Sequence, residues 1–178
     1  MAQRGQYNVP RLLQRNNKLT TMLAFSHFAE SAMRAAHLCA RSYAPYYKWL
    51  LHSTEQLPQG AELAALLQKS TTLPLKQWET EIIAPVCAII AKQMKEQGIS
   101  TQEESYMQVH AEAAAQQAAL LEQKEALVEK IVRLEFSEFD KVKNEGVRAG
   151  CQDDWETFSI MRKSQYLTWE LPMLEQYW

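Results

Sequence analysis

The chain has 178 residues, of which 47% are hydrophobic, and glycine (5) and proline (6) are scarce, which disfavours a turn-rich β fold and a disordered chain. The net charge is −2, but residues 1–50 carry seven basic residues and one acidic residue (+6), and residues 51–178 carry 12 and 20 (−8). The basic end could meet a polyanion such as the phosphates of a nucleotide, or it could pack against the protein's own acidic part. No run of about 18 apolar residues exists, so we expect no membrane segment and a cytoplasmic location.

The first third of the chain predicts three helices. Apolar residues at spacings of three and four indicate one helix, or a broken pair, over residues 10–42, with Asn8 as a candidate cap. This pattern stops before Pro45, because proline disfavours helix at the residue that precedes it. Short helices follow at about 45–54 and 61–69, on either side of a Pro-Gln-Gly turn.

Two longer helices are predicted next. The first runs over about 74–97, with a kink at Pro85 and Gly98 as its C-cap. The residues at 100–103, Ser-Thr-Gln-Glu, have the spacing of a capping box, and they open an uninterrupted helical pattern over about 101–143. Its Ala/Gln-rich part has a weak apolar face, which is typical of a helix that links two parts of a chain.

The last third predicts a loop, one helix and a tail. The loop covers 144–152, Asp153 is the expected cap of a helix over about 154–168, and Pro172 ends that helix or offsets the tail. The chain finishes on two large aromatic residues at 177–178, which suggests truncation of a longer protein or docking of the tail onto the body.

These elements predict an all-α protein, a bundle of about six to seven helices in which one long helix links two parts. We expect a helical bundle over 1–99, and over 100–178 the long helix, the loop and a C-terminal helix.

Basic and aromatic residues of the first part form the candidate binding site. Arg34, His37 and Arg41 stand at i, i+3 and i+7, so they share one face of a helix, and two guanidiniums with an imidazole could hold a phosphate or a carboxylate. The segments 5–11 and 43–49 add tyrosines that could stack on a ring. The alternative is that the aromatic residues form core and the arginines pair with carboxylates.

Other polar groups are interpreted as structural. Arg148, Cys151, Asp153 and Asp154 lie close in sequence, but no histidine is near to activate the thiol, and the two aspartates point apart if the second is helical. The carboxylates of 122–140 interleave with basic residues, as on a solvated helix face. His27, His52 and His110 lack a metal-ligand partner, and the cysteines Cys39, Cys87 and Cys151 read as reduced thiols. The sequence therefore predicts no catalytic residue, no metal and no cofactor.

The stretches GQYNVPRLLQRNN and YAPYYKWL, with LPLKQWETEIIAPVCAII further on, resemble the helical C-terminal half of an uncharacterised bacterial nucleotidyltransferase-like family, over residues 5–98. In such proteins this half follows a catalytic half in the style of kanamycin nucleotidyltransferase. The catalytic Gly-Ser loop and Asp-x-Asp pair are absent here. The resemblance implies a substrate-holding bundle whose matching positions are Tyr7, Arg11, Arg41, Tyr46, Tyr47 and Lys48.

The stretch VRLEFSEFDKVKNEGVRAGCQDDWETFSIMRKSQYLTW resembles the start of a second bacterial family of unknown function, over residues 121–178. That family is often joined to the first. This sequence departs from its pattern at Val147 and Gly150, and the family continues beyond the point where this chain ends.

Three functions are compatible with these patterns. The first is a non-catalytic substrate-binding or lid portion of a nucleotidyltransferase-like system, with a nucleotide or small anion as ligand and a catalytic domain or subunit as partner. The second is a helical interaction module, with a homodimer as one form. The third, a helical ribonuclease, needs an arginine followed four to six residues later by a histidine on one helix, and Arg34 and His37 are too close for that.

Overall fold

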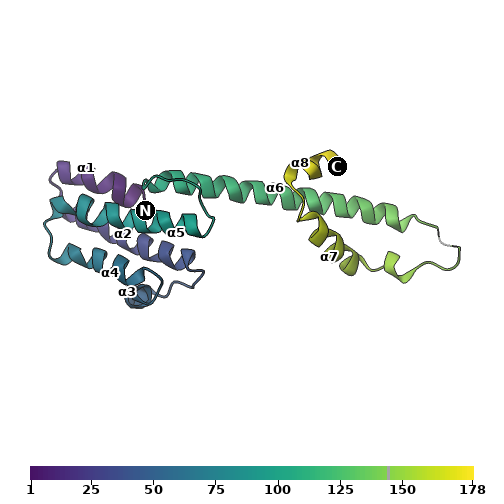
Figure 1. Ribbon diagram of the computed structural model, residues 1–178, viewed down its shortest axis with the longest axis horizontal. Helices are drawn as coiled ribbons and strands as arrows, with labels where there is room; N and C mark the ends of the chain where they lie inside the picture. Colours follow the sequence, from purple (N-terminus) through teal and green to yellow (C-terminus); the bar gives the residue numbers. More distant parts are fainter. Residues whose placement is uncertain (144) are drawn as a thin grey trace. The chain divides into compact units, whose positions relative to one another are not determined.

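The computed structural model describes residues 1–143 and 145–178, so Asn144 of the predicted loop lies outside the described residues. Every regular element in these ranges is helical, with eight α-helices joined by short 3₁₀ and π turns (Figure 1). The predicted all-α class is confirmed. The chain divides into two compact units, an N-terminal unit, Met1–Ala115, and a C-terminal unit, Gln116–Trp178. None of the described helices has the length and apolar character needed to cross a membrane.

The predicted helix over 10–42 is a broken pair. A π-helix, η1 (Gln3–Tyr7), leads directly into α1 (Asn8–Gln14), so Asn8 lies inside helical backbone and is not a cap. The break follows, and α2 (Lys18–Cys39) starts after Asn17, whose side-chain oxygen accepts a hydrogen bond from the Thr20 backbone N–H at 3.2 Å. An asparagine in this position satisfies one of the unpaired donors of the first helical turn.

The next helices lie beside α2 (Figure 1). They are α3 (Tyr47–Glu55) and α4 (Gly60–Gln68), followed by the 3₁₀ turns η2 (Lys69–Thr71) and η3 (Leu75–Gln77), the π-helix η4 (Glu79–Ile83) and α5 (Ala84–Glu96). At Pro85, where a kink is predicted, the helix changes from the π type to the α type. Pro85 has no N–H to donate, and it stands in the first turn of α5, directly after the π-helical residues. Gly98 has φ +67° and ends α5 as predicted.

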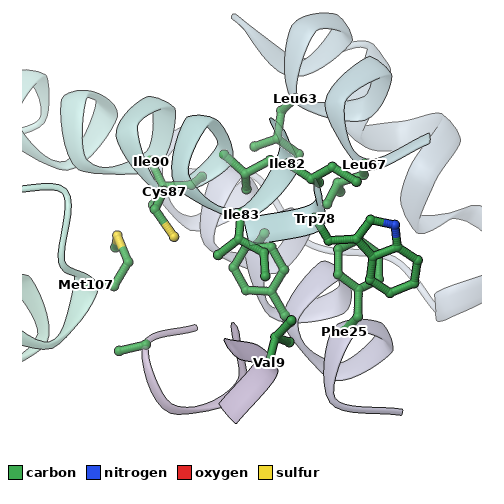
Figure 2. Close-up of a cluster of buried hydrophobic side chains, with 14 of the residues drawn as sticks. Val9, Phe25, Leu63, Leu67, Trp78, Ile82, Ile83, Cys87, Ile90 and Met107 are labelled. Carbon is green, nitrogen blue, oxygen red and sulfur yellow. The ribbon is translucent and has the colours of Figure 1, made fainter. Parts of the chain in front are cut away.

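The N-terminal unit is built around one buried face of α2. Phe25, Phe28, Ala32 and Ala36 recur at spacings of three and four, and Phe28 and Ala32 are fully buried. Ile82, Ile83, Cys87 and Ile90 of the η4–α5 segment cover this face together with residues of α4 (Figure 2). Phe25 packs on Trp78, with their ring centroids 4.4 Å apart. Burial raises the pKa of the Cys87 thiol to about 12, so this cysteine is an inert part of the core.

Glycine at position 5 lets η1 approach this core closely. A Cβ at Gly5 would lie 2.3 Å from the ring of Phe28, well inside van der Waals contact. The first residues of the chain are therefore packed against the middle of α2.

The long helix α6 (Met107–Asp140) starts six residues later than predicted. Ser100 does not begin a capping box. Its hydroxyl accepts a hydrogen bond from the Gln102 N–H at 3.2 Å and lies 2.9 Å from Nδ1 of the buried His110. The first N–H of α6, that of Met107, donates instead to the side-chain oxygen of Gln6 at 2.9 Å.

The C-terminal unit consists of the later part of α6, the 3₁₀ turn η5 (Gly150–Gln152), α7 (Trp155–Tyr166) and α8 (Leu171–Tyr177). Among the described residues, its buried hydrophobic side chains are few: Val128, Ile131, Val132, Tyr166 and Leu174. Pro172 stands in the first turn of α8, so it opens a helix and does not displace the tail.

Candidate ligand-binding surface

Four large aromatic side chains lie exposed at the junction of α2 and α3. Tyr43 is 91% exposed, Tyr46 63%, Tyr47 61% and Trp49 65%. Two cations, Arg41 and Lys48, belong to the same ten residues and are also exposed. We call these six residues the aromatic–cationic surface: Arg41, Tyr43, Tyr46, Tyr47, Lys48 and Trp49.

The end of α2 positions Arg41 at one side of this surface. Beyond Cys39 the backbone reverses through Arg41, whose φ of +52° is in the left-handed region. The N–H of Ser42 donates to the His37 carbonyl at 2.9 Å, which closes the helix end. Glycine is the usual residue at such a position, and an arginine there costs about 1 kcal/mol.

The start of α3 positions the aromatic rings. After an extended segment, α3 is fixed to the bundle by Leu50 and Thr54, which are 1% and 0% exposed. The residues of its first turn then project outward, because the helix can turn only one side toward the core. The rings of Tyr46 and Tyr47 lie 4.4 Å apart between centroids, inclined at 50°.

The cations of this surface have no partner among the residues that the structure describes. Across residues 1–143 and 145–178, neither Arg41 nor Lys48 forms an ion pair or a side-chain hydrogen bond. Their charges are therefore available to an anion, and the neighbouring rings offer flat apolar faces.

Arg34 and His37 stand one turn apart in α2, but the guanidinium of Arg34 is paired with a carboxylate and the ring of His37 is buried. Arg34 is half exposed and pairs with Glu30, with Nε 3.0 Å from the carboxylate oxygen. His37 is fully buried. Its Nδ1 lies 3.4 Å from the Ser42 hydroxyl, and its Nε2 has no partner within the described chain. Burial, and then the charge of Arg34, lower the pKa of His37, so a neutral ring is favoured in the folded protein.

Tyr7 and Arg11 form a separate pair. The Arg11 guanidinium lies 4.2 Å from the centroid of the Tyr7 ring and also donates to its hydroxyl. Gly5, just before this pair, packs on Phe28 of α2. Arg41 stands 13 residues after Phe28, at the end of α2, which is about 20 Å away at 1.5 Å per helical residue. Of the eight predicted site residues, four lie exposed within residues 41–48: Arg41, Tyr46, Tyr47 and Lys48.

In the C-terminal unit, the loop before α7 uses its polar groups to hold the end of α6. Gln152 donates to the carbonyls of Phe139 and Val142, both at 2.9 Å. Arg148 pairs with Asp140 and with Asp153, the latter at 2.9 Å. The bond to Phe139 satisfies one of the carbonyls that a helix leaves free at its C-terminus.

The cap of α7 is Asp154, and the prediction of Asp153 is wrong by one residue. The Asp154 carboxylate accepts a hydrogen bond from the Thr157 N–H at 3.0 Å, which lowers its pKa. Asp153 is bound to Arg148, a pairing that the capping pattern does not reveal. No group of three His, Cys, Asp or Glu side chains in the described residues could hold a metal ion.

The interpretation of the 122–140 carboxylates as a solvated face fails at Glu135. Arg162 donates to Glu135 through Nε at 2.8 Å and Nη2 at 2.6 Å, and the hydroxyls of Tyr166 and Tyr177 also donate to it. Burial alone would raise the pKa of Glu135, but these hydrogen bonds outweigh it and the pKa is lowered. The partners lie 27 to 42 residues away, so no local pattern could indicate them.

Beside Glu135 lies a cavity of about 450 Å³, lined mainly by apolar groups such as Phe139, Phe158 and Trp178. The carboxylate and guanidinium at its wall bind each other and the two tyrosines. We therefore interpret this cluster as the connection that holds α7 and α8 to α6.

Comparison with known proteins finds a family model that matches each end of the chain, and neither model has an assigned activity. Residues 1–50 match a family model described as "Domain of unknown function (DUF4037)", and residues 125–178 match one described as "Protein of unknown function (DUF4125)". No curated protein and no solved structure matches the chain. The prediction that parts of two families of unknown function are joined here is confirmed.

Proposed function

We propose that the N-terminal unit is a non-catalytic module that binds a nucleotide, or a similar small anion with a ring, for a nucleotidyltransferase-like catalytic domain. The observation that carries this proposal is the aromatic–cationic surface, on which four aromatic side chains, each more than 60% exposed, accompany two unpaired cations. In the part of the chain that the structure describes, no other ten residues combine these two properties.

Each half of a nucleotide has a counterpart on this surface. A nucleobase stacked on a tyrosine or tryptophan ring gains about 1–3 kcal/mol. Guanidinium and ammonium groups bind phosphate oxygens through charge-assisted hydrogen bonds. The net charge of +6 over residues 1–50 adds a longer-range attraction for an anion.

The catalytic part of the proposal rests on the sequence. Residues 5–98 resemble the helical half that accompanies a catalytic half, and the chain has no Gly-Ser loop with an Asp-x-Asp pair. In this proposal the transfer chemistry belongs to a separate catalytic domain or subunit, and the bundle supplies binding and orientation.

Calorimetric titration of the full chain with ATP and GTP tests the binding. Removing the rings (Tyr46→Ala with Tyr47→Ala) or the charges (Arg41→Gln with Lys48→Gln) should weaken binding at least tenfold. Two exposed residues outside this surface, changed by Tyr106→Ala and Lys69→Gln, provide matched controls. Equal affinities in all four variants would show that the surface is not the site.

Arg41→Gly gives a second and sharper test. Glycine adopts the left-handed conformation of position 41 without the steric strain of a side chain, so the variant should be more stable than the wild type by about 1 kcal/mol. It should also bind nucleotide more weakly, because the guanidinium is lost. A gain in stability without a loss of affinity would show that Arg41 takes no part in binding.

An exposed apolar face on α2 supports a second candidate function, an interaction or dimerisation module. Leu19, Met22 and Leu23, at helical spacing, are 71%, 52% and 55% exposed. Sedimentation over a range of concentrations separates the candidates: a dimer that Leu23→Lys dissociates supports the interaction module, and a monomer at all concentrations counts against self-association.

A further inference from the structure

A second feature of the N-terminal unit lies at the other end of α2. A cavity of about 510 Å³ opens between the end of α1, the first turn of α2 and the η3 segment. Its volume is typical of sites that hold small organic molecules, which are about 300–1,000 Å³. Residues on its wall include Leu13, Asn16, Asn17, Lys18, Leu75 and Lys76.

The polar side of this cavity is cationic. Lys18 comes from α2 and Lys76 from η3, so two elements far apart in sequence bring positive charge to one space. Neither lysine has an ion-pair partner in the part of the chain that the structure describes, and none of the residues that line the cavity is acidic. Asn17 uses its oxygen to cap α2, which leaves its NH₂ group free to donate.

The remaining wall is apolar. Leu13 and Leu75 are half-buried members of the core, and each also faces the cavity. A bare inorganic ion would leave this surface exposed to water. A ligand with an apolar body would cover it and gain about 25 cal/mol for each Å² of apolar surface removed from water.

We infer that this cavity binds a small organic oxyanion, a phosphate or a carboxylate carried on an apolar body. Lys18 and Lys76 bind the anionic group, the NH₂ of Asn17 donates to it, and the leucines contact the body. The cavity is separate from the aromatic–cationic surface, because the 22 residues of α2 between them span about 33 Å.

Titration of the full chain with three probes at constant ionic strength tests this inference. The probes are phenyl phosphate, benzoate and inorganic phosphate. Phenyl phosphate should bind at least fivefold more tightly than inorganic phosphate, and its comparison with benzoate identifies the preferred anionic group. Equal binding of phenyl phosphate and inorganic phosphate would refute a role for the apolar wall, and a lack of saturable binding by all three would refute the site.

Variants locate the binding. Lys18→Gln with Lys76→Gln should weaken phenyl phosphate binding at least tenfold, whereas Lys69→Gln, an exposed and unpaired lysine of the same unit, should leave it unchanged. Both lysines of the cavity are exposed, and circular dichroism confirms that the variants are folded. Equal affinities of the double variant and the control would overturn the inference. Arg41→Gln with Lys48→Gln removes the charges of the aromatic–cationic surface. In this background phenyl phosphate should still bind, and adding Lys18→Gln with Lys76→Gln should still weaken that binding at least tenfold, so a failure here and a failure of the proposed nucleotide surface are distinguishable.

Discussion

Glu135 is the residue at which the structure makes its strongest prediction about stability. Its side chain is 18% exposed and that of Arg162 is 34% exposed, so the pair is neither a surface salt bridge nor a fully buried one. Exposed pairs contribute about 0–1 kcal/mol, and removing one partner of a buried pair costs about 3–5 kcal/mol. Glu135→Gln should therefore destabilise the C-terminal unit by about 2 kcal/mol, because an amide presents N–H donors to the N–H groups of Arg162.

Hydrogen exchange in the native state measures this effect where it arises. A loss of about 2 kcal/mol should accelerate the exchange of α7 and α8 amides by about 30-fold, since 1.4 kcal/mol corresponds to a factor of ten. Glu138→Gln is the matched control. Glu138 lies one turn further along α6 and is 61% exposed, and among the described residues its carboxylate binds only Lys141. Its loss should change stability by less than about 0.5 kcal/mol. If both variants accelerate exchange equally, the cluster around Glu135 does not hold the unit together.

Three further changes have clear expected outcomes. Gly60→Ala should cost about 3 kcal/mol in urea unfolding, since the new Cβ would lie 1.8 Å from the Thr54 carbonyl oxygen, and a neutral result would mean that the α3–α4 turn adjusts freely. Burial holds the pKa of His37 below its ordinary value. As the pH drops below about 6.5, the imidazole therefore gains a proton in the unfolded chain before it does so in the folded one, and the free energy of unfolding should fall. His37→Gln should remove this part of the pH dependence. Asp154→Ala should speed amide exchange in the first turn of α7, whereas Asp153→Ala should not. The opposite result would show that Asp153 is the cap, as the sequence predicts.

Local patterns predicted the helices well because their causes are local. The spacing of apolar residues along α2 and the left-handed Gly98 depend only on neighbours in the chain. The start of α6 could not be predicted in this way. Its first N–H donates to the side chain of Gln6, which is 101 residues away. The local pattern at Ser100 contains no information about this distant partner.

The exposure of part of the candidate site has a similarly local origin. Tyr46, Tyr47 and Lys48 follow a proline, and their exposure follows from the short helix that Leu50 anchors. The i, i+3, i+7 spacing of Arg34 and Arg41 assumes that the helix continues, but α2 ends at Cys39 and the chain reverses. The cavity between Lys18 and Lys76 depends on the packing of two distant segments, which spacing along the chain cannot reveal.

Gln6 also determines which substitutions this region of the protein can accept. Its amide group donates to the carbonyl of residue 105 at 2.7 Å and accepts from the N–H of residue 107, so both of its partners are main-chain atoms. The side chain at 105 can consequently change without disturbing either bond, whereas any replacement of Gln6 removes at least one of them. A mutational scan should find position 6 intolerant and position 105 permissive, and sequence covariation between the two segments should be weak even though they are directly joined.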